Sequence, residues 1–206
     1  MASVITTPAD VVNLALSLIG YQFRIGNLFE GSKAAKAALD VYSHTRDAKL
    51  RGGDWPFASR SVAGTLLKSA PVGGYFPPNT WTAASNPPQP WRYEYTYPDD
   101  CLELRACKPQ VYFVPNFQPQ SYLFAISNDN GYTPPRRVIL SNVAEAMLIY
   151  TAQVTDPATW PPDFVDAFAA DLAKILAPEL MKSVDMMKVA AGEETVQTAQ
   201  AETRQG

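Results

Sequence analysis

The sequence predicts an α+β fold in which N- and C-terminal helices pack as a helical bundle, with an inserted antiparallel β region that forms a sandwich or small barrel. Apolar residues recur with a helical period near both ends of the chain, whereas the middle alternates with a period of two. The middle also holds most of the 18 prolines among the 206 residues. These changes predict four segments: N-terminal helices over residues 1–54, a β-rich region over 55–155, a C-terminal helix over 156–182, and a polar segment over 183–206.

The first helix is marked by its start and its stop. Thr7 can cap it, Pro8 suits the first turn, and Asp10 stands where a capping box places its acidic residue. Gly20 supplies a left-handed stop. Spacings of three and four predict an apolar face made of Val11, Leu14, Ala15, Leu18 and Ile19.

A second, alanine-rich helix is expected from a Ser32 cap to Arg51, with Gly52 as its terminator. Lys49 and Arg51 lie in the last turn, where positive charge complements the helix dipole. The predicted apolar face of this helix consists of Ala35, Leu39 and Tyr42.

Two aromatic residues follow this helix directly. Gly53 lets the chain turn away, and Pro56 fixes the backbone between Trp55 and Phe57. Large aromatic side chains at a fold boundary favour packing over exposure. We therefore expect Trp55 and Phe57 to be structural anchors, buried where the helices meet the β region.

The clearest strand is "WRYEYTYPDD", residues 91–100, in which aromatic and polar residues alternate. An aromatic stripe could stack on bases or sugars, but strand spacing favours core packing. Trp91, Tyr93 and Tyr95 are thus expected to be structural anchors. Shorter strands are predicted over residues 62–68, 101–107, 121–127 and 136–141, with a turn at "NDNG", residues 128–131.

Residues 146–154 fit two structures. An Asn142 cap with Glu145 three residues later favours a helix, whereas the β-branched residues that follow favour a strand. The strand is the preferred interpretation.

A long loop is predicted over residues 71–90, because its prolines prevent ladder pairing. Loops of this length are usually exposed and often make contacts. Tyr75, Phe76 and Trp81 are therefore candidate interface residues.

The apolar stripe near the C-terminus predicts a helix that Asp163 caps and that Pro178 kinks or ends. Its face consists of Phe164, Val165, Phe168, Leu172, Ile175 and Leu176. From residue 183 the chain is polar, so an isolated helix there would be marginal. We expect this segment to become ordered on assembly, with candidate interface residues Met186, Met187, Val189 and Val196.

Composition excludes several classes of protein. With 47% apolar residues the chain can bury a core of its own. A net charge of −3 and a pI near 5.2 argue against a nucleic-acid wrapper, which needs a basic face. No apolar run approaches the roughly 18 residues of a membrane span, so no membrane partner is expected.

Metal and cofactor sites are not expected. Cys101 and Cys107 would lie roughly 20 Å apart on one extended strand, too far for a disulfide, and are expected to be free thiols. His44 is the single histidine, and no Cys-x-x-Cys pair accompanies it, so a zinc site lacks ligands. Phosphate and dinucleotide fingerprints are missing too.

Catalytic residues are similarly scarce. A Ser43–His44 pair would be badly oriented, because adjacent helical residues do not face each other. Asp99, Asp100 and Glu103 form the best carboxylate cluster, of the kind that a hydrolase of wall polysaccharide needs. "PDD" is also an ordinary turn, which is the preferred interpretation. The protein is therefore expected not to be an enzyme.

The order of several motifs resembles one family. "DVVNLALSLIG", a second helix ending shortly before "WPF", then "WRYEYTYPDDCLEL" and "LIYTAQVTDPATWPPDFVDAFAADLAKILAPEL" occur in this order and spacing. Together they resemble the head-to-tail adaptor proteins of tailed bacteriophages, the tail tubular protein A group. The resemblance runs from about Asp10 to Leu180, and the Pro-rich loop and polar tail depart from it.

The resemblance implies a structural virion protein of the tail or neck, assembled in the bacterial host cytoplasm. Such proteins form a ring, usually of twelve copies, between the portal protein and another tail or nozzle protein. The ring extends the channel for DNA exit, and an acidic lumen would let DNA pass without specific binding. The alternatives are a virion-associated hydrolase of bacterial wall polysaccharide and another neck or head-completion ring protein.

Overall fold

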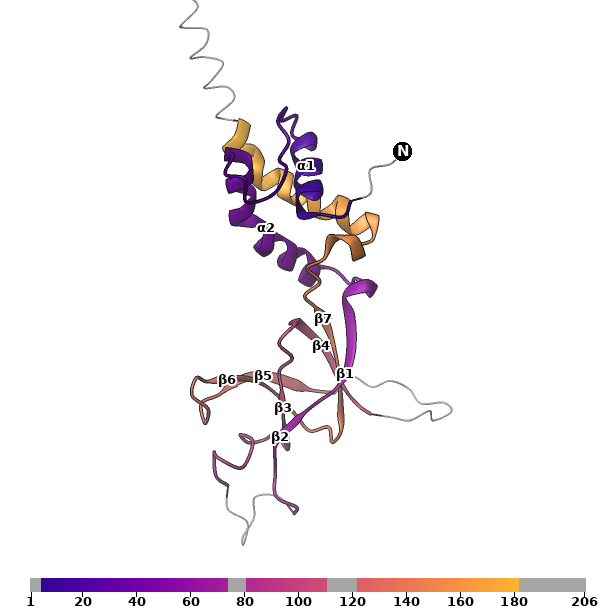
Figure 1. Ribbon diagram of the computed structural model, residues 1–206. Coiled ribbons are helices and arrows are strands. Elements are labelled where there is room, and N and C mark those ends of the chain that lie inside the picture. The colour runs from indigo at the N-terminus through magenta and orange to yellow at the C-terminus, as the bar shows by residue number, and fades with distance from the viewer. Residues whose placement is uncertain (1–4, 74–80, 111–121, 182–206) are drawn as a thin grey trace, which may run out of the picture. The chain divides into compact units, whose positions relative to one another are not determined.

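The computed structural model describes residues 5–73, 81–110 and 122–181. These residues contain three helices from the two ends of the chain and two antiparallel sheets between them, so the predicted α+β class is confirmed (Figure 1). They divide into two compact units. The helical unit combines the residues up to Lys49 with those from Val154 on, and the sheet unit is Leu50–Gln153.

Helix α1 spans Pro8–Leu18, and both of its ends match the sequence signals. Thr7 and Asp10 form the predicted capping box. At the other end, Gly20 has a φ of 71°, and the N–H of Tyr21 donates to the carbonyl of Leu16 at 3.0 Å. This is a Schellman stop, for which the left-handed conformation of a glycine is suited.

The buried face of α1 differs from the predicted one. Val11 and Ala15 are buried as expected, but Val12 and Leu16 join them. Leu18 is 58% exposed, and Leu14 and Ile19 are only partly buried. The face is rotated because apolar residues stand on both sides of Val11 and Ala15, and periodicity does not decide which side packs.

Helix α2 spans Lys33–Gly52. The Ser32 hydroxyl accepts a hydrogen bond from the N–H of Ala35 at 3.2 Å, which confirms the predicted cap. Ala35 and Tyr42 are buried, but Leu39 is 41% exposed and Ala38 is buried instead. Four small alanines on the inner face allow close approach of a neighbouring element: Ala34, Ala35, Ala37 and Ala38.

The C-terminal helix covers residues 162–181 as far as the structure describes the chain. The carbonyl of Pro161 accepts from the N–H groups of Phe164 and Val165, so Asp163 lies inside the first turn and the prediction that it caps the helix is wrong. The helix also continues past Pro178. Leu180 beyond the proline is fully buried, and this burial offsets the lost backbone hydrogen bond.

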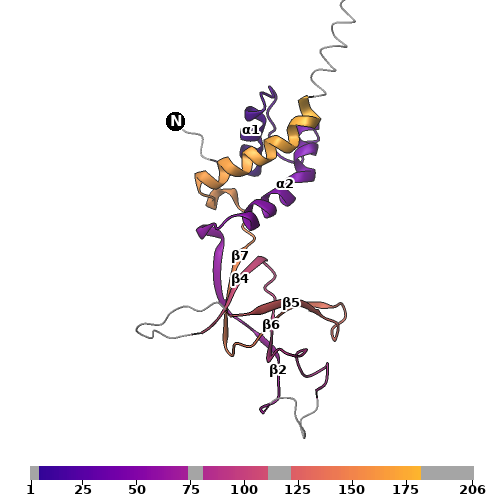
Figure 2. The ribbon, with the colours of Figure 1, turned by 180° about the vertical axis from the view of Figure 1, so that it is seen from behind.

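Aromatic rings form the centre of the helical unit. Phe168 lies 5.2 Å from Tyr42 and 5.6 Å from Trp160 between ring centroids, and it stacks on Phe164 at 6.0 Å. Lys49 and Asp171 join α2 to the C-terminal helix by an ion pair of 2.8 Å. In both views the C-terminal helix, drawn in orange and yellow, lies beside α1 and α2 (Figure 1, Figure 2).

The sheet unit contains a three-stranded sheet in the order β1-β7-β4 and a four-stranded sheet in the order β2-β3-β6-β5. Pairing between neighbours is antiparallel throughout both sheets. The strands are β1 Ser59–Ala63, β2 Leu66–Ser69, β3 Tyr93–Thr96, β4 Cys101–Pro109, β5 Phe124–Asp129, β6 Arg136–Ser141 and β7 Ala146–Ala152. The open choice for residues 146–154 is thus decided in favour of a strand.

One predicted strand is in fact two. Residues 62–68 were expected to be continuous, but β1 belongs to the three-stranded sheet and β2 to the four-stranded one. Gly64 stands between them, and a Cβ there would lie 2.9 Å from the ring of Tyr95 and 3.2 Å from the carbonyl of Ala146. The chain can cross between the sheets at this point because glycine has no side chain.

The two sheets share one apolar core, as in a sandwich. Tyr95 and Ile139 of the four-stranded sheet pack in the same cluster as Leu104 and Leu148 of the other sheet. Cys101 and Cys107 on β4 are buried free thiols, as predicted. The Tyr95 hydroxyl donates to the carbonyl of Val143 at 2.7 Å.

The tyrosine stripe therefore enters the core, as the alternation predicts. Tyr95 and Tyr97 are buried, and Tyr93 packs partly buried against the cluster. Trp91 is partly buried as well. Arg137, one of two arginines at the start of β6, lies 4.2 Å from the centre of the Tyr97 ring and so covers its face.

Trp55 and Phe57 are only half-buried, contrary to the expectation of buried anchors. Their ring centroids are 6.4 Å apart, and a Cβ at Gly53 would overlap the indole Nε1 of Trp55. The indole thus lies over the Gly53 backbone. The same backbone is held by Arg105, whose Nη2 donates to the carbonyls of Arg51 and Gly53 at 2.8 and 3.0 Å.

Half-burial lowers the expected cost of removing Trp55. We expect Trp55→Ala to destabilise the protein by about 1–2 kcal/mol, below the 3–5 kcal/mol typical of a fully buried aromatic residue. Urea unfolding of the two proteins at one pH measures the difference. A loss above about 3 kcal/mol would show that the indole is energetically a core residue.

Candidate functional site

Three charged side chains meet on one face of the four-stranded sheet. Lys68 lies on β2, opposite Glu94 on β3, and Asp129 ends β5. Successive side chains of a strand point to opposite faces, so Glu94 lies on the face away from Tyr95 and the shared core. The charged group therefore has its own surroundings, outside the main apolar cluster.

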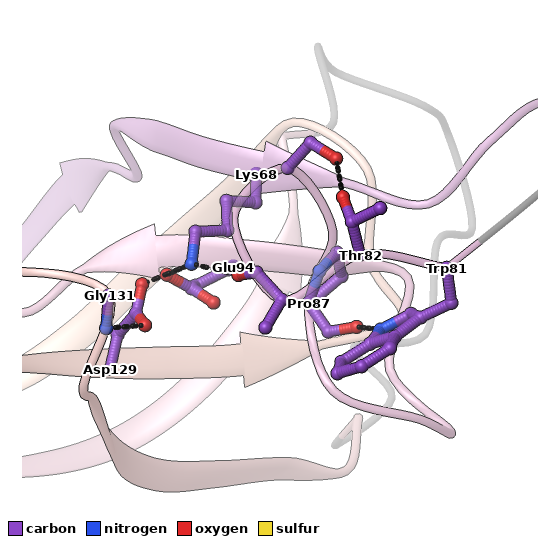
Figure 3. A network of polar contacts seen from close by, with 9 residues as sticks. Lys68, Trp81, Thr82, Pro87, Glu94, Asp129 and Gly131 are labelled. Carbon is purple, nitrogen blue, oxygen red and sulfur yellow. Dashed lines mark hydrogen bonds and ion pairs between the residues drawn. The ribbon is translucent and has the colours of Figure 1, made fainter.

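These three residues are buried. Lys68 is 8% exposed and Glu94 only 1%, and the Asp129 side chain is 11% exposed. The Lys68 ammonium group donates to the Asp129 carboxylate and to the carbonyl of Ala83, the latter at 3.0 Å. It lies 3.8 Å from Glu94 Oε1, beyond hydrogen-bond distance (Figure 3).

The charges in this cluster balance only when one carboxyl group is protonated. Burial, followed by a hydrogen bond with Asp129, raises the pKa of Glu94 to about 7, although the Lys68 charge opposes the shift. Burial also acts to raise the pKa of Asp129. Hydrogen bonds from Lys68, from the Gly131 N–H and from Glu94 outweigh it, and the Asp129 pKa is lowered. Glu94 therefore carries the shared proton, and the cluster is neutral below the Glu94 pKa.

This arrangement predicts a pH-dependent stability. Glu94 has a pKa of about 7 in the folded protein against an ordinary value of 4.5, so the folded state binds the proton more tightly. The resulting stabilisation is fully present below about pH 4.5 and is lost as the pH rises to about 7. The lowered pKa of Asp129 acts in the opposite sense at more acidic pH, outside this window. We expect the urea midpoint of the sheet unit to fall across the window.

The matched variant is Glu94→Gln, which keeps the shape of the side chain and removes its titration. Its urea midpoint should change less with pH than that of the wild type, and should equal or exceed it at about pH 8. All other titratable groups are the same in both proteins, so the difference between the two profiles isolates residue 94. Parallel pH profiles for the two proteins would contradict the assignment of the proton to Glu94.

A segment of the Pro-rich loop covers the cluster. Asn86 is 8% exposed, and its amide donates to the carbonyl of Ser69 at 3.1 Å while its oxygen accepts from the N–H of Thr82 at 3.0 Å. The Trp81 indole N–H donates to the carbonyl of Pro87 at 2.9 Å, as Figure 3 shows. This folded segment and the sheet line a cavity of about 430 Å³ that is open to solvent on one side.

Neither the protein-family models nor the curated proteins contain a match to this chain.

Of the seven predicted interface residues, the structure describes only Trp81. Trp81 is 42% exposed and lines the cavity. The remaining candidates lie outside the described residues: Tyr75, Phe76, Met186, Met187, Val189 and Val196. Their assignment as interface residues stays a prediction.

The three carboxylates that the hydrolase alternative requires have different surroundings in the structure. Asp99 is exposed. Asp100 accepts a hydrogen bond from the Tyr150 hydroxyl at 2.8 Å and lies 3.5 Å from the Arg60 guanidinium. Glu103 lies 3.5 Å from Arg105.

Sequence analysis missed the Lys68–Glu94–Asp129 cluster. The alternation in residues 91–100 predicts that Glu94 points away from the tyrosines, but it does not predict the burial of that face. One sequence signal could have indicated a buried charge. Glu94 stands at the centre of a strand rich in aromatic residues, and a long Pro-rich loop that can cover it comes just before. The identity of its partners depends on strand order, which the local pattern does not contain.

Among the described residues, His, Cys, Asp and Glu side chains do not gather in any group of three that could hold a metal ion. The helices in the same parts of the chain are too short or too polar to cross a membrane.

Proposed function

We propose that this protein is a structural component of a tailed-phage virion, the adaptor ring that joins the portal to the tail and extends the DNA exit channel. The observation that carries the proposal is the exposure of large apolar side chains on the helical unit. Such exposure is typical of subunits that bury those side chains on assembly. The residues concerned are Leu18, Phe23, Phe29, Leu39 and Ile175.

The connection between α1 and α2 presents two of these side chains. Phe23 is 69% exposed and Phe29 is 81% exposed. Solvent-facing phenylalanines at these levels are unfavourable unless a partner covers them. This connection is therefore the strongest candidate for contact with a neighbouring copy in the ring.

The same connection is held in one conformation. Asn13 bonds both backbone groups of Ile25, accepting from its N–H at 2.8 Å and donating to its carbonyl at 2.9 Å. Glu30 accepts from the N–H of Gly26 at 2.6 Å and from the Ser32 hydroxyl at 2.7 Å. A preorganised segment binds with less loss of conformational entropy, which suits an assembly surface.

The net charge supports the same function. At −3 per subunit, a ring of many copies would carry a strongly negative field. DNA in its lumen would be repelled by the wall and could pass without adhering. The proposal gives the chain a structural role, with copies of itself, the portal protein and another tail protein as its partners.

The test is assembly of the purified full-length chain, alone and with its portal protein, followed by mass photometry and negative-stain microscopy. We expect rings on portals. The double variant Phe23→Ser/Phe29→Ser should stay folded and fail to form them, because the apolar contact is lost. Leu123→Ser, which alters an 84% exposed side chain of the sheet unit, is the matched control and should assemble. Failure of the wild type to assemble on portals would refute the adaptor role.

A further inference from the structure

The cavity beside the Lys68–Glu94–Asp129 cluster has the size of a small-molecule site. Its volume of about 430 Å³ lies within the range of roughly 300–1,000 Å³ that ligand pockets occupy. Val138 and Leu140 of β6 supply an apolar floor, and Ala83 and Pro88 supply an apolar cover. Apolar walls with a few polar groups are typical of such sites.

One wall of the cavity is an oriented aromatic ring. Trp81 is 42% exposed, although its indole N–H is already bonded to Pro87. This bond fixes the ring and leaves its surface as the group available to a ligand. An exposed indole held in this way offers a flat apolar platform.

The polar lining comes from the end of β5 and the turn after it. Ser127 and Asn130 line the cavity, and their side chains form no hydrogen bond with any residue that the structure describes. The hydroxyl of Ser127 and the amide of Asn130 can each donate and accept. They suit a ligand that carries several donors and acceptors of its own.

The buried end of the cavity lacks one hydrogen bond. Glu94 lines the cavity, is 1% exposed, and its Oε1 has no hydrogen-bond partner in the described structure. A buried acceptor without a donor is costly, and a ligand hydroxyl would satisfy it. Lys68 disfavours a cationic ligand at this place, and Glu94 and Asp129 disfavour an anionic one.

We propose that this cavity binds a neutral polyhydroxylated ligand, a saccharide of one or two residues. Its C–H face lies on Trp81, its hydroxyl groups bond Ser127 and Asn130, and one hydroxyl donates to Glu94. The inference does not rest on the adaptor role, because it follows from the cavity alone.

The test is saturation-transfer-difference NMR on the full-length protein, with glucose, galactose and N-acetylglucosamine as separate probes. We expect at least one sugar to receive saturation with a dissociation constant of about 1 mM or lower. Trp81→Ala and Asn130→Ala should each weaken its binding about tenfold, a loss of roughly 1.4 kcal/mol. Trp55→Ala, which removes an indole of the same unit outside the cavity, should leave binding unchanged.

Three results would overturn the proposal. The first is no saturation of any of the three sugars at about 50 mM, far above the expected dissociation constant. The second is binding of n-butylamine or inorganic phosphate in preference to the sugars, which would show a charged ligand. The third is equal weakening by Trp55→Ala and Trp81→Ala. Asn130 is exposed, so its variant tests the site even if Trp81→Ala perturbs the loop.

Discussion

Lys68→Met is expected to destabilise the sheet unit by about 3–5 kcal/mol, the cost of leaving a buried charge without its partner. The ammonium group of Lys68 is the one cation that contacts both Glu94 and Asp129 within the described structure. Without it, two carboxyl groups remain buried side by side. Protonation of both relieves the repulsion only at acidic pH, so the loss should be greatest above neutral pH. Urea unfolding of wild type and variant at about pH 8 gives the measurement.

Lys108→Met is the matched control. It removes the same charge from β4, where Lys108 is partly exposed, and should change the free energy of unfolding by less than about 0.5 kcal/mol. The triple variant Lys68→Met/Glu94→Gln/Asp129→Asn should recover much of the loss, because it removes the unpaired charges as well. A cost below about 1 kcal/mol for Lys68→Met alone would mean that the cluster is solvated rather than buried.

Phe168→Ala is expected to cost about 3–5 kcal/mol in the helical unit. The ring is fully buried and contacts three other aromatic rings, those of Tyr42, Trp160 and Phe164. Its removal leaves a cavity that these rigid rings fill poorly, since each is held by its own neighbours. The midpoint of thermal or urea unfolding, followed by the circular dichroism of the helices, reports the change.

The control for this variant is a substitution on the exposed face of the same helix. Ile175 is on the same helix and is 46% exposed, so Ile175→Ala should cost less than about 1 kcal/mol at concentrations where the protein is monomeric. Equal losses for Phe168→Ala and Ile175→Ala would contradict the placement of the aromatic cluster at the centre of the unit.

Local signals predicted the ends of elements well. The Thr7–Asp10 capping box, the Gly20 stop and the Ser32 cap are set by residues within a few positions of the helix end. Strand β6 likewise matches its predicted range, 136–141. In each case the interactions that decide the structure lie inside the segment that contains the pattern.

Predictions that depended on partners were less accurate. Leu18 and Leu39 have the spacing of core residues and yet are exposed, because periodicity gives the apolar arc but not the part of it that a neighbour covers. The division of residues 62–68 between two sheets depends on Tyr95 and the Ala146 carbonyl, which approach Gly64 from other strands.

The candidate site shows the same limit. Alternation placed Glu94 correctly on the face opposite Tyr95, but burial of that face requires Lys68, Asp129 and the loop around Asn86. Strand order, which brings β2, β3, β6 and β5 into one sheet, is a property of the whole fold. A sequence pattern read within one segment therefore finds the glutamate and misses the site.

The pairing of β1 with β7 brings the two ends of the sheet unit together. β1 follows the end of α2 and β7 precedes the C-terminal helix, and Ser59 and Thr151 are direct partners in the antiparallel register. Paired Cα atoms lie only about 4.5–5.5 Å apart, so the sheet unit leaves from and returns to nearly the same place. The sandwich of roughly a hundred residues therefore spans no greater distance between its two ends than a short helix–helix connection does. The chain therefore has the topology of a helical unit into which the sandwich is inserted as one continuous segment, with an apolar core in each part.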